Sequence, residues 1–199
     1  MPLLKSDELN FYEYVDKVVR MYSARIIRMF NTLRSKKFDK NRDLIAYLDD
    51  FYDDLYILAL EAYRSIAKRY YGEDLGTKWI EDKILKTYDP VTLYVFTHEV
   101  DRKRGRHLEA VIASDNPAAE HDKAMKNWTN MFRQYADEVA DRANIEKLKK
   151  SGEKEVIWMT EKDNRVCRTC RDREGMIYPI SKIPTKPHIG CRCWVVENG

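Results

Sequence analysis

Residues 186–195, KPHIGCRCWV, bring a histidine and two cysteines close together near the end of the printed sequence. A second pair of cysteines lies upstream of it, in NRVCRTCRDREG at 164–175. The chain has 4 cysteines, and all of them lie in these two stretches. Two such pairs are typical of a structural zinc site, because each pair folds into a tight turn that presents two ligands of a tetrahedron. The sequence therefore predicts a small metal-binding module in this region.

The predicted zinc ligands are spaced as two pairs, with one further residue as a substitute. They are Cys167, Cys170, His188 and Cys191, with Cys193 as the substitute. In a strand, residues separated by one position point to opposite faces, so only one of Cys191 and Cys193 is expected to bind. A module of this size buries little apolar surface, and bound zinc would supply folding free energy directly.

Three other interpretations of these residues stay open. The cysteines could be free, partly buried thiols, with His188 held by hydrogen bonds alone. A thioredoxin-like redox pair is less well supported, because that motif opens a helix after a buried strand, whereas the residues after Cys170 lead toward a turn at Gly175. A catalytic zinc is not indicated, since the sequence contains no His-Glu-x-x-His.

The residues around the cysteines have the composition of a small β module. The runs EVIWMT (155–160), GMIYPI (175–180) and CRCWVV (191–196) are rich in β-branched and aromatic residues and are separated by turn residues. Because composition changes near residue 150, we predict two domains: a helical body at 1–150 and a Cys/His-rich β module at 151–199.

The first 150 residues show the periodicity of long helices, with apolar residues at steps of three and four. Ser6 is expected to cap the first helix, Gly72 to end the second and Asp89 to cap the fourth, with Pro90 in its first turn. The expected helices are 6–33, 44–72, 75–88, 90–113 and a fifth that runs through 125–139 and fades within 147–154. The fold class predicted is mainly α: long antiparallel helices followed by a compact, few-stranded, zinc-knuckle-like module of β or α+β type.

Composition excludes several classes of protein. Hydrophobic residues make up 44% of the 199, which argues against wholesale disorder, and a net charge of +3 argues against a uniformly basic, histone-like surface. No apolar stretch is long enough to span a membrane, and the first residues lack the apolar run of a secretory signal. We therefore expect a soluble protein made in a reducing cytoplasm, where clustered thiols more often bind metal than form disulfides.

The ordered series of residues from 156 to 195 resembles the C-terminal region of the Mu F-like phage head morphogenesis, or minor capsid, proteins. The resemblance covers roughly 40 of the 199 residues, and the series is more specific than any single pair of cysteines. Outside the five candidate ligands, it rests on Trp158, Asp163, Gly175, Pro187 and Arg192.

This resemblance implies a virion component that is not an enzyme. Proteins of the family are usually encoded beside the portal protein, are carried in small numbers in the procapsid, and take part in head assembly or in handling DNA as it enters the host. The implied partners are the portal, capsid and scaffold proteins, with double-stranded DNA as a further partner. The implied location is the interior of the phage head, near the portal vertex.

The family also implies that zinc is not essential to the shared fold, since some members have Arg and His at the positions of Cys167 and Cys170. In those proteins the region would be held by hydrogen bonds and packing. Asp163 and Arg192 are candidates for such a fastening, because a carboxylate and a guanidinium form strong paired hydrogen bonds.

Two basic clusters in the helical body are candidates for contact with DNA phosphates or with an acidic rim of the portal. They consist of Arg102, Lys103, Arg104 and Arg106 in one run, and Lys149 and Lys150 in another. The alternative is an ordinary solvated helix face. Two rival functions also stay open: a zinc-ribbon-like regulator that binds nucleic acid, and an enzyme, either a thiol oxidoreductase or a toxin-type hydrolase.

Overall fold

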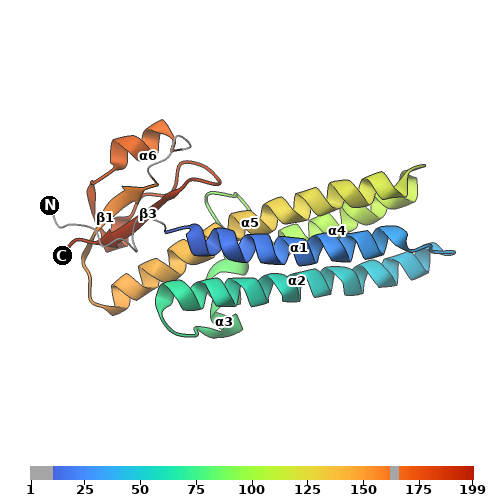
Figure 1. The fold of residues 1–199 in the computed structure, drawn as a ribbon, viewed down its shortest axis with the longest axis horizontal. Helices are drawn as coiled ribbons and strands as arrows, with labels where there is room; N and C mark the ends of the chain where they lie inside the picture. Colours follow the sequence, from blue (N-terminus) through green and yellow to red (C-terminus); the bar gives the residue numbers. More distant parts are fainter. Residues whose placement is uncertain (1–10, 162–165) are drawn as a thin grey trace.

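The computed structural model of the protein describes residues 11–161 and 166–199. In that part of the chain, four long helices form a bundle and a three-stranded sheet lies at one end of it (Figure 1). The elements are α1 (Glu13–Ser35), α2 (Asn41–Tyr71), α3 (Gly76–Ile80), the π-helical turn η2 (Glu81–Leu85), α4 (Phe96–Ala113), α5 (Pro117–Lys150), β1 (Glu155–Thr160), α6 (Arg168–Arg173), β2 (Ile177–Pro179), the 3-10 turn η3 (Ile180–Lys182) and β3 (Cys193–Glu197). The predicted fold class, mainly α with a small C-terminal β module, is confirmed.

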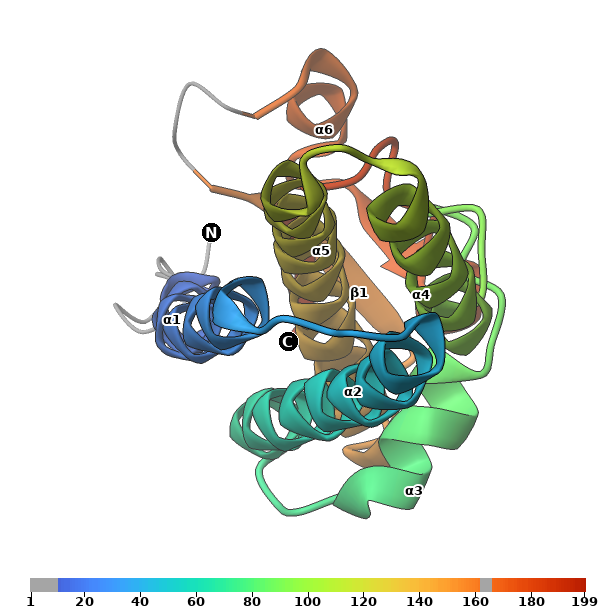
Figure 2. The same ribbon diagram turned by 90° about the vertical axis from the view of Figure 1, so that its right-hand side faces the viewer.

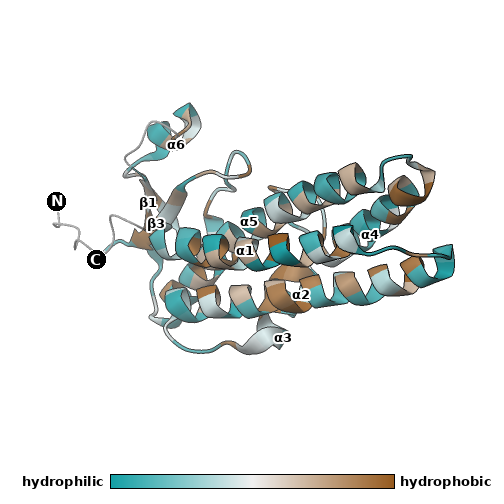
Figure 3. Ribbon diagram, turned by 45° about the vertical axis from the view of Figure 1, so that its right-hand side comes forward, coloured by the Kyte–Doolittle hydropathy of each residue, from teal (hydrophilic) through white to brown (hydrophobic). Residues whose placement is uncertain are grey.

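The core of the bundle lies between α1, α2, α4 and α5, which surround it when viewed end-on (Figure 2). Each long helix carries both hydrophobic and hydrophilic residues along its length (Figure 3), as the three- and four-residue periodicity requires. Aromatic rings fill the centre: Tyr63 stacks on Phe132 at 5.4 Å between centroids, and Phe96 meets Tyr135 at 4.7 Å. No helix within the described ranges is long and apolar enough to cross a membrane.

Most helix ends lie where the sequence places them. Gly72 ends α2 with φ of 101°, and its N–H donates to the carbonyl of Lys68 at 3.0 Å; this left-handed conformation favours glycine. Asn116 caps α5 by accepting from the N–H of Ala119 at 3.3 Å. Helix α5 ends at Lys150, inside the predicted stretch 147–154, and three lysines in its last turn interact favourably with the carbonyl end of the helix dipole. The predicted Ser6 cap lies outside the described residues.

The prediction that the fourth helix begins at Asp89–Pro90 is wrong. Helix α4 begins at Phe96, and the Asp89 carboxylate instead accepts from the N–H of Val91 at 2.9 Å, closing a turn. The chain then reverses at Leu93, which has φ of 66°, a conformation that no helix contains. Asp89 therefore has the cap-like hydrogen bonds that the sequence predicts, but they stabilise a loop.

The three predicted strands form one antiparallel sheet with the order β2-β1-β3. Trp158 of β1 pairs with Val195 of β3, and Thr160 pairs with Cys193. The connection between β1 and β2 contains the short helix α6, which the sequence analysis did not predict. Cys167 is its N-cap residue, so the first pair of cysteines does open a helix, and the expected turn at Gly175 follows it with φ of 75°.

The sheet packs against the bundle through aromatic and polar contacts. Phe11 stacks on Trp194 of β3 at 5.3 Å with an interplanar angle of 7°, and Asn144 of α5 donates to the carbonyl of Val195 at 2.8 Å. Trp194 and Met159 belong to the same buried cluster as the bundle core. Secondary structure changes from helix to strand between 150 and 155, and the division into two domains stays a prediction.

A buried polar network joins the bundle to the loop before β3. The Lys186 ammonium contacts the Asp141 carboxylate of α5, and it lies 2.5 Å from the Tyr12 hydroxyl. Tyr12 donates to Asp141 at 2.8 Å and lies 2.7 Å from the carbonyl of Cys193. Burial alone would lower the pKa of Lys186, but the adjacent Asp141 carboxylate outweighs it, so the net shift is upward and the lysine stays charged.

A second buried network lies in the bundle core, where two histidines meet. Nε2 of His107 lies 2.8 Å from Nδ1 of His121, and Nδ1 of His107 lies 3.1 Å from the Tyr52 hydroxyl. His107 is 4% exposed, and burial together with the neighbouring His121 lowers its pKa to about 4. Both rings are therefore held neutral in the folded protein at neutral pH.

This histidine pair is expected to make the fold sensitive to acid. A lowered pKa in the folded state stabilises the fold above the ordinary histidine pKa, and this stability is lost as pH falls from about 6.5 toward about 4. The His107→Gln variant should lose about 3 kcal/mol less unfolding free energy over this range than the wild type does. Urea unfolding at several pH values measures the difference, with His98→Gln, exposed on the same helix, as control. Equal pH slopes for wild type and His107→Gln would contradict the prediction.

Candidate metal centre

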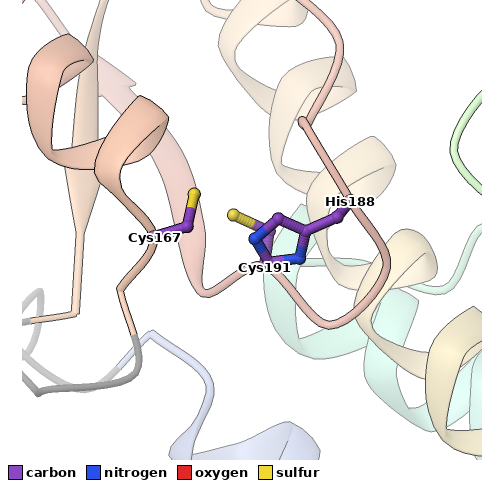
Figure 4. Close-up of side chains that lie close together, drawn as sticks. All are labelled: Cys167, His188 and Cys191. Carbon is purple, nitrogen blue, oxygen red and sulfur yellow. The ribbon is translucent and has the colours of Figure 1, made fainter.

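The predicted metal ligands come from three neighbouring segments of the C-terminal module. Cys167 and Cys170 lie at the start of α6, His188 and Cys191 lie in the loop before β3, and Cys193 is the first residue of β3. Figure 4 shows the side chains of Cys167, His188 and Cys191 directed toward one another across the space between α6 and this loop. The structure thus brings together residues that are far apart in the sequence.

The donor atoms of the five residues form two triads that share Cys191. Cys167, His188 and Cys191 have donor atoms within 4.8 Å of one another, and so do Cys170, Cys191 and Cys193. Sγ of Cys191 lies 2.9 Å from Sγ of Cys170 and 3.4 Å from Sγ of Cys193. Sulfur ligands of tetrahedral zinc lie about 3.8 Å apart, given Zn–S bonds of about 2.3 Å. Small side-chain rotations are therefore enough to bring four of these donors around one ion.

Local backbone structure holds the donors in place. Sγ of Cys167 accepts from the N–H of Cys170 at 3.4 Å, which fixes the first pair in the N-terminal turn of α6. In the second pair, Nδ1 of His188 lies 3.0 Å from the carbonyl of Ile189, and Gly190 has φ of 73°. The hydrogen bond at Nδ1 leaves Nε2 of His188 as the ring nitrogen available for a metal ion.

The expectation that Cys191 and Cys193 point to opposite faces is wrong. It assumed that both residues lie in a strand, but β3 begins only at Cys193, so the two-residue alternation does not reach Cys191. Both thiols are buried and lie side by side. The Cys193 thiol therefore lies close enough to Cys191 to bind the same metal ion.

The electrostatics of the cluster favour a thiolate at Cys191. The pKa of Cys191 is lowered to about 5, chiefly because the Cys193 thiol donates a hydrogen bond to it, with Cys170 adding to the effect. The pKa of Cys193 is raised for the converse reason, because the thiol donates to Cys191 and is buried. A buried thiolate among further thiols and one imidazole is a donor set for a soft or borderline metal ion. The Cys/His cluster could therefore bind a metal.

The other residues of the predicted motif surround this cluster. Trp158 is buried in β1, with the Arg173 guanidinium 5.2 Å from the centre of its ring, while Pro187 is exposed in the loop. Arg192 forms ion pairs with Asp16 of α1 at 3.2 Å and with Glu161 at 3.5 Å. Asp163 lies outside the described residues, so its pairing with Arg192 stays a prediction.

The basic run on α4 is largely neutralised by carboxylates. Arg102 and Lys103 both pair with the buried Glu99, at 2.5 and 3.3 Å, and Arg104 lies 3.4 Å from Asp49 of α2. Burial would raise the pKa of Glu99, but the hydrogen bonds from Arg102 and Lys103 hold it below its usual range. The fourth predicted cation of this run, Arg106, is exposed on α4.

The two lysines at the end of α5 also have acidic partners. Lys149 pairs with Glu146 at 2.8 Å, and Lys150 pairs with Glu73 at 2.5 Å. The end of α5 lies beside the sheet, whereas α4 runs through the other half of the bundle (Figure 1). The two basic clusters are therefore not one continuous surface.

Sequence reasoning missed the three residues that connect the metal cluster to the bundle: Tyr12, Asp141 and Lys186. Asp141 had one available signal, because it lies within the apolar phase of α5 and next to the buried Ala140. Lys186 stands in the stretch KPHIG, but nothing in its neighbours shows that its side chain is buried. These contacts hold the loop that carries His188 and Cys191 against the bundle.

Comparisons with known proteins return no similar protein. No protein-family model matches the chain, and neither a curated protein nor a solved structure is significantly similar to it.

Proposed function

We propose that this protein is a phage minor head protein of the Mu F-like type, in which a zinc ion stiffens the C-terminal module and the helical body docks on the portal or capsid. Its action is binding and positioning, without a bond-making step. The protein would act inside the phage head near the portal vertex, with scaffold proteins and double-stranded DNA as further partners.

One observation supports this proposal above the others: the residues of the motif converge in space. Trp158, Cys170, Cys191 and Cys193 belong to one buried cluster, Cys167 packs against it, and a ring nitrogen of His188 lies within 4.8 Å of the Cys167 and Cys191 sulfurs. If the resemblance were a chance match in sequence, its residues would not be expected to lie close together in the fold.

The donor set fits zinc. Four cysteines and one histidine supply sulfur and imidazole nitrogen, which are the ligands of structural zinc sites, and three of the cysteines are buried. Cys167, Cys170, His188 and Cys191 would hold the ion, with Cys193 as the substitute. Bound zinc would supply rigidity and folding free energy to a module whose own apolar cluster is small.

The neutralised basic run bears on the rival function. A regulator that reads nucleic acid depends on cations that are free to meet phosphates. Most of the predicted cations pair instead with carboxylates of the chain, such as Glu99 and Asp49. The alternative function, a regulator that binds nucleic acid, therefore gains no support from the basic run on α4.

The proposed function is tested in purified phage particles and procapsids. If the proposal holds, mass spectrometry of particles from a host that carries the gene should detect the chain in a few copies per head, together with the portal protein. Co-expression with that portal protein should yield a complex that survives size-exclusion chromatography. Absence of the chain from both particles and procapsids would contradict the proposal, whatever the zinc content of the purified protein.

A further inference from the structure

A groove beside the sheet collects cations that have no acidic partner among residues 11–161 and 166–199. The groove has a volume of about 760 Å³ and lies between the start of α1, the ends of α2 and α5, and β3. We call it the basic groove and define it by Lys17, Arg20, Arg69 and Lys147, with Tyr14 and Trp194 in its wall. None of these four cations forms an ion pair with a carboxylate of the described residues, unlike the cations of α4 and the last two lysines of α5.

The lining of the groove gives it the character of a docking surface. Tyr14 is half-buried with its hydroxyl 2.8 Å from Oγ of Ser65, and the Arg69 guanidinium lies 6.0 Å from the centre of its ring. Cations beside fixed aromatic rings are suited to an acidic partner that also carries some apolar surface. Glu13 and Glu197 also line the groove, and they interrupt the continuous positive surface that a phosphate backbone prefers.

The chain itself carries a surface of that chemistry on α2. Asp50, Asp53, Asp54 and Ile57 are spaced so that they share one face of the helix, and all four are exposed. Ile57 is 55% exposed, and no ion pair within the described part of the chain engages the three carboxylates. We call these four residues the acidic face. Its three carboxylates and one apolar side chain match the cations and the aromatic wall of the basic groove.

The two surfaces lie at different places along α2. The acidic face occupies the middle turns of this helix, residues 50–57 of 41–71, whereas the basic groove lies at its end beside the sheet (Figure 1). A single chain cannot bring them together, but two copies can. Such a contact is head-to-tail, because each copy uses a different surface and keeps one of them open for a further copy.

We propose that the basic groove of one copy of this protein binds the acidic face of a second copy. The cations of the groove meet the three aspartates, and Ile57 packs against the aromatic wall. The contact involves neither a metal ion nor a portal protein, so it stands apart from the proposed function and can fail without it.

The experiment is sedimentation equilibrium of the full-length protein at two salt concentrations. At about 0.1 M salt the protein should self-associate, and at about 1 M, where charges are screened beyond about 3 Å, its dissociation constant should rise at least tenfold. Lys17→Glu/Arg20→Glu and Asp50→Lys/Asp53→Lys should each be monomeric at the lower salt. Lys37→Glu/Lys126→Glu changes the same number of exposed charges outside both surfaces and should associate as the wild type does.

Mixing the two monomeric variants gives the decisive result. The groove variant keeps its acidic face, the α2 variant keeps its groove, and their reversed charges are also complementary, so an equimolar mixture should associate although each variant alone is monomeric. A wild type that stays monomeric at about 0.1 M salt overturns the proposal, and so does a mixture that shows no dimer. Salt-dependent retention of duplex DNA by a monomeric wild type, lost in Lys17→Glu/Arg20→Glu, would assign the groove to phosphates and also overturn it.

Discussion

Replacing Cys191 by serine is expected to release the zinc ion and to loosen the C-terminal module. Cys191 is the one residue common to both triads of donor atoms, so its loss breaks both triads at once. It is also the thiol whose pKa is lowered most clearly by its neighbours, which makes it the thiolate on which the site is built. Bound zinc should fall from about one equivalent to less than about 0.2, because structural sites need all four ligands.

Metal analysis under reducing conditions measures this loss, and thermal unfolding followed by tryptophan fluorescence reports on Trp158 and Trp194 beside the site. His98→Ala, which removes an exposed imidazole from α4, is the matched control for His188→Ala and should keep its zinc. His188→Ala should lower zinc affinity more than Cys193→Ser does, since Cys193 is the substitute ligand. Less than about half an equivalent of zinc in the wild type would remove the metal proposal altogether.

The sequence predicts those features of this protein that depend on local spacing. Long helices follow from apolar residues at steps of three and four, because the same periodicity that identifies a helix also forms its buried face. The helix end at Gly72 is equally local, since a left-handed residue after the last turn favours glycine over any other. The clustering of the cysteines was predictable for a related reason: short spacings restrict each pair to a single turn.

The errors arose where a local pattern has two outcomes that only the rest of the chain decides. Whether a helix or a loop follows, the Asp89 carboxylate can accept hydrogen bonds from the next backbone N–H groups. Because the backbone reverses at Leu93, these hydrogen bonds close a loop here and do not begin a helix. Cys191 and Cys193 lie side by side because the strand begins two residues later than the pattern suggests, so Cys191 lies outside it. A shift of one or two residues in a strand boundary is smaller than a propensity argument can detect, yet it decides whether the alternation of faces applies to a thiol.

The contacts between distant segments were beyond the reach of the sequence. Tyr12, Asp141 and Lys186 come from the start of α1, the second half of α5 and the loop before β3, and no spacing in the sequence predicts that they meet. Likewise, Arg104 of the basic run finds Asp49 on a neighbouring helix, a pairing that depends on how α2 and α4 pack. Charge runs in a sequence therefore overstate the free charge on a folded surface.

Replacing Lys186 by methionine is expected to destabilise the protein by about 3–5 kcal/mol, because it leaves the buried Asp141 carboxylate without its cation. The side chains of the pair are only 15% and 10% exposed, so water cannot replace the lost partner. For a chain of this size the melting temperature should fall by about 10 °C. Lys182→Met, at an exposed position in the turn η3 that precedes this loop, is the matched control and should change it little.

The double variant Lys186→Met/Asp141→Leu separates an ion pair from simple packing. If the two charges stabilise each other, removing both should cost less than the sum of Lys186→Met and Asp141→Leu, since neither charge is then left buried and unpaired. Urea unfolding measures this coupling. Strictly additive losses would show that the pair does not act as a unit. Lys186 anchors the loop that carries His188 and Cys191. The single variant Lys186→Met should therefore also weaken zinc binding, although all five candidate ligands remain in the chain. The contact between this loop and α5 would then be required for the metal site as well as for the fold.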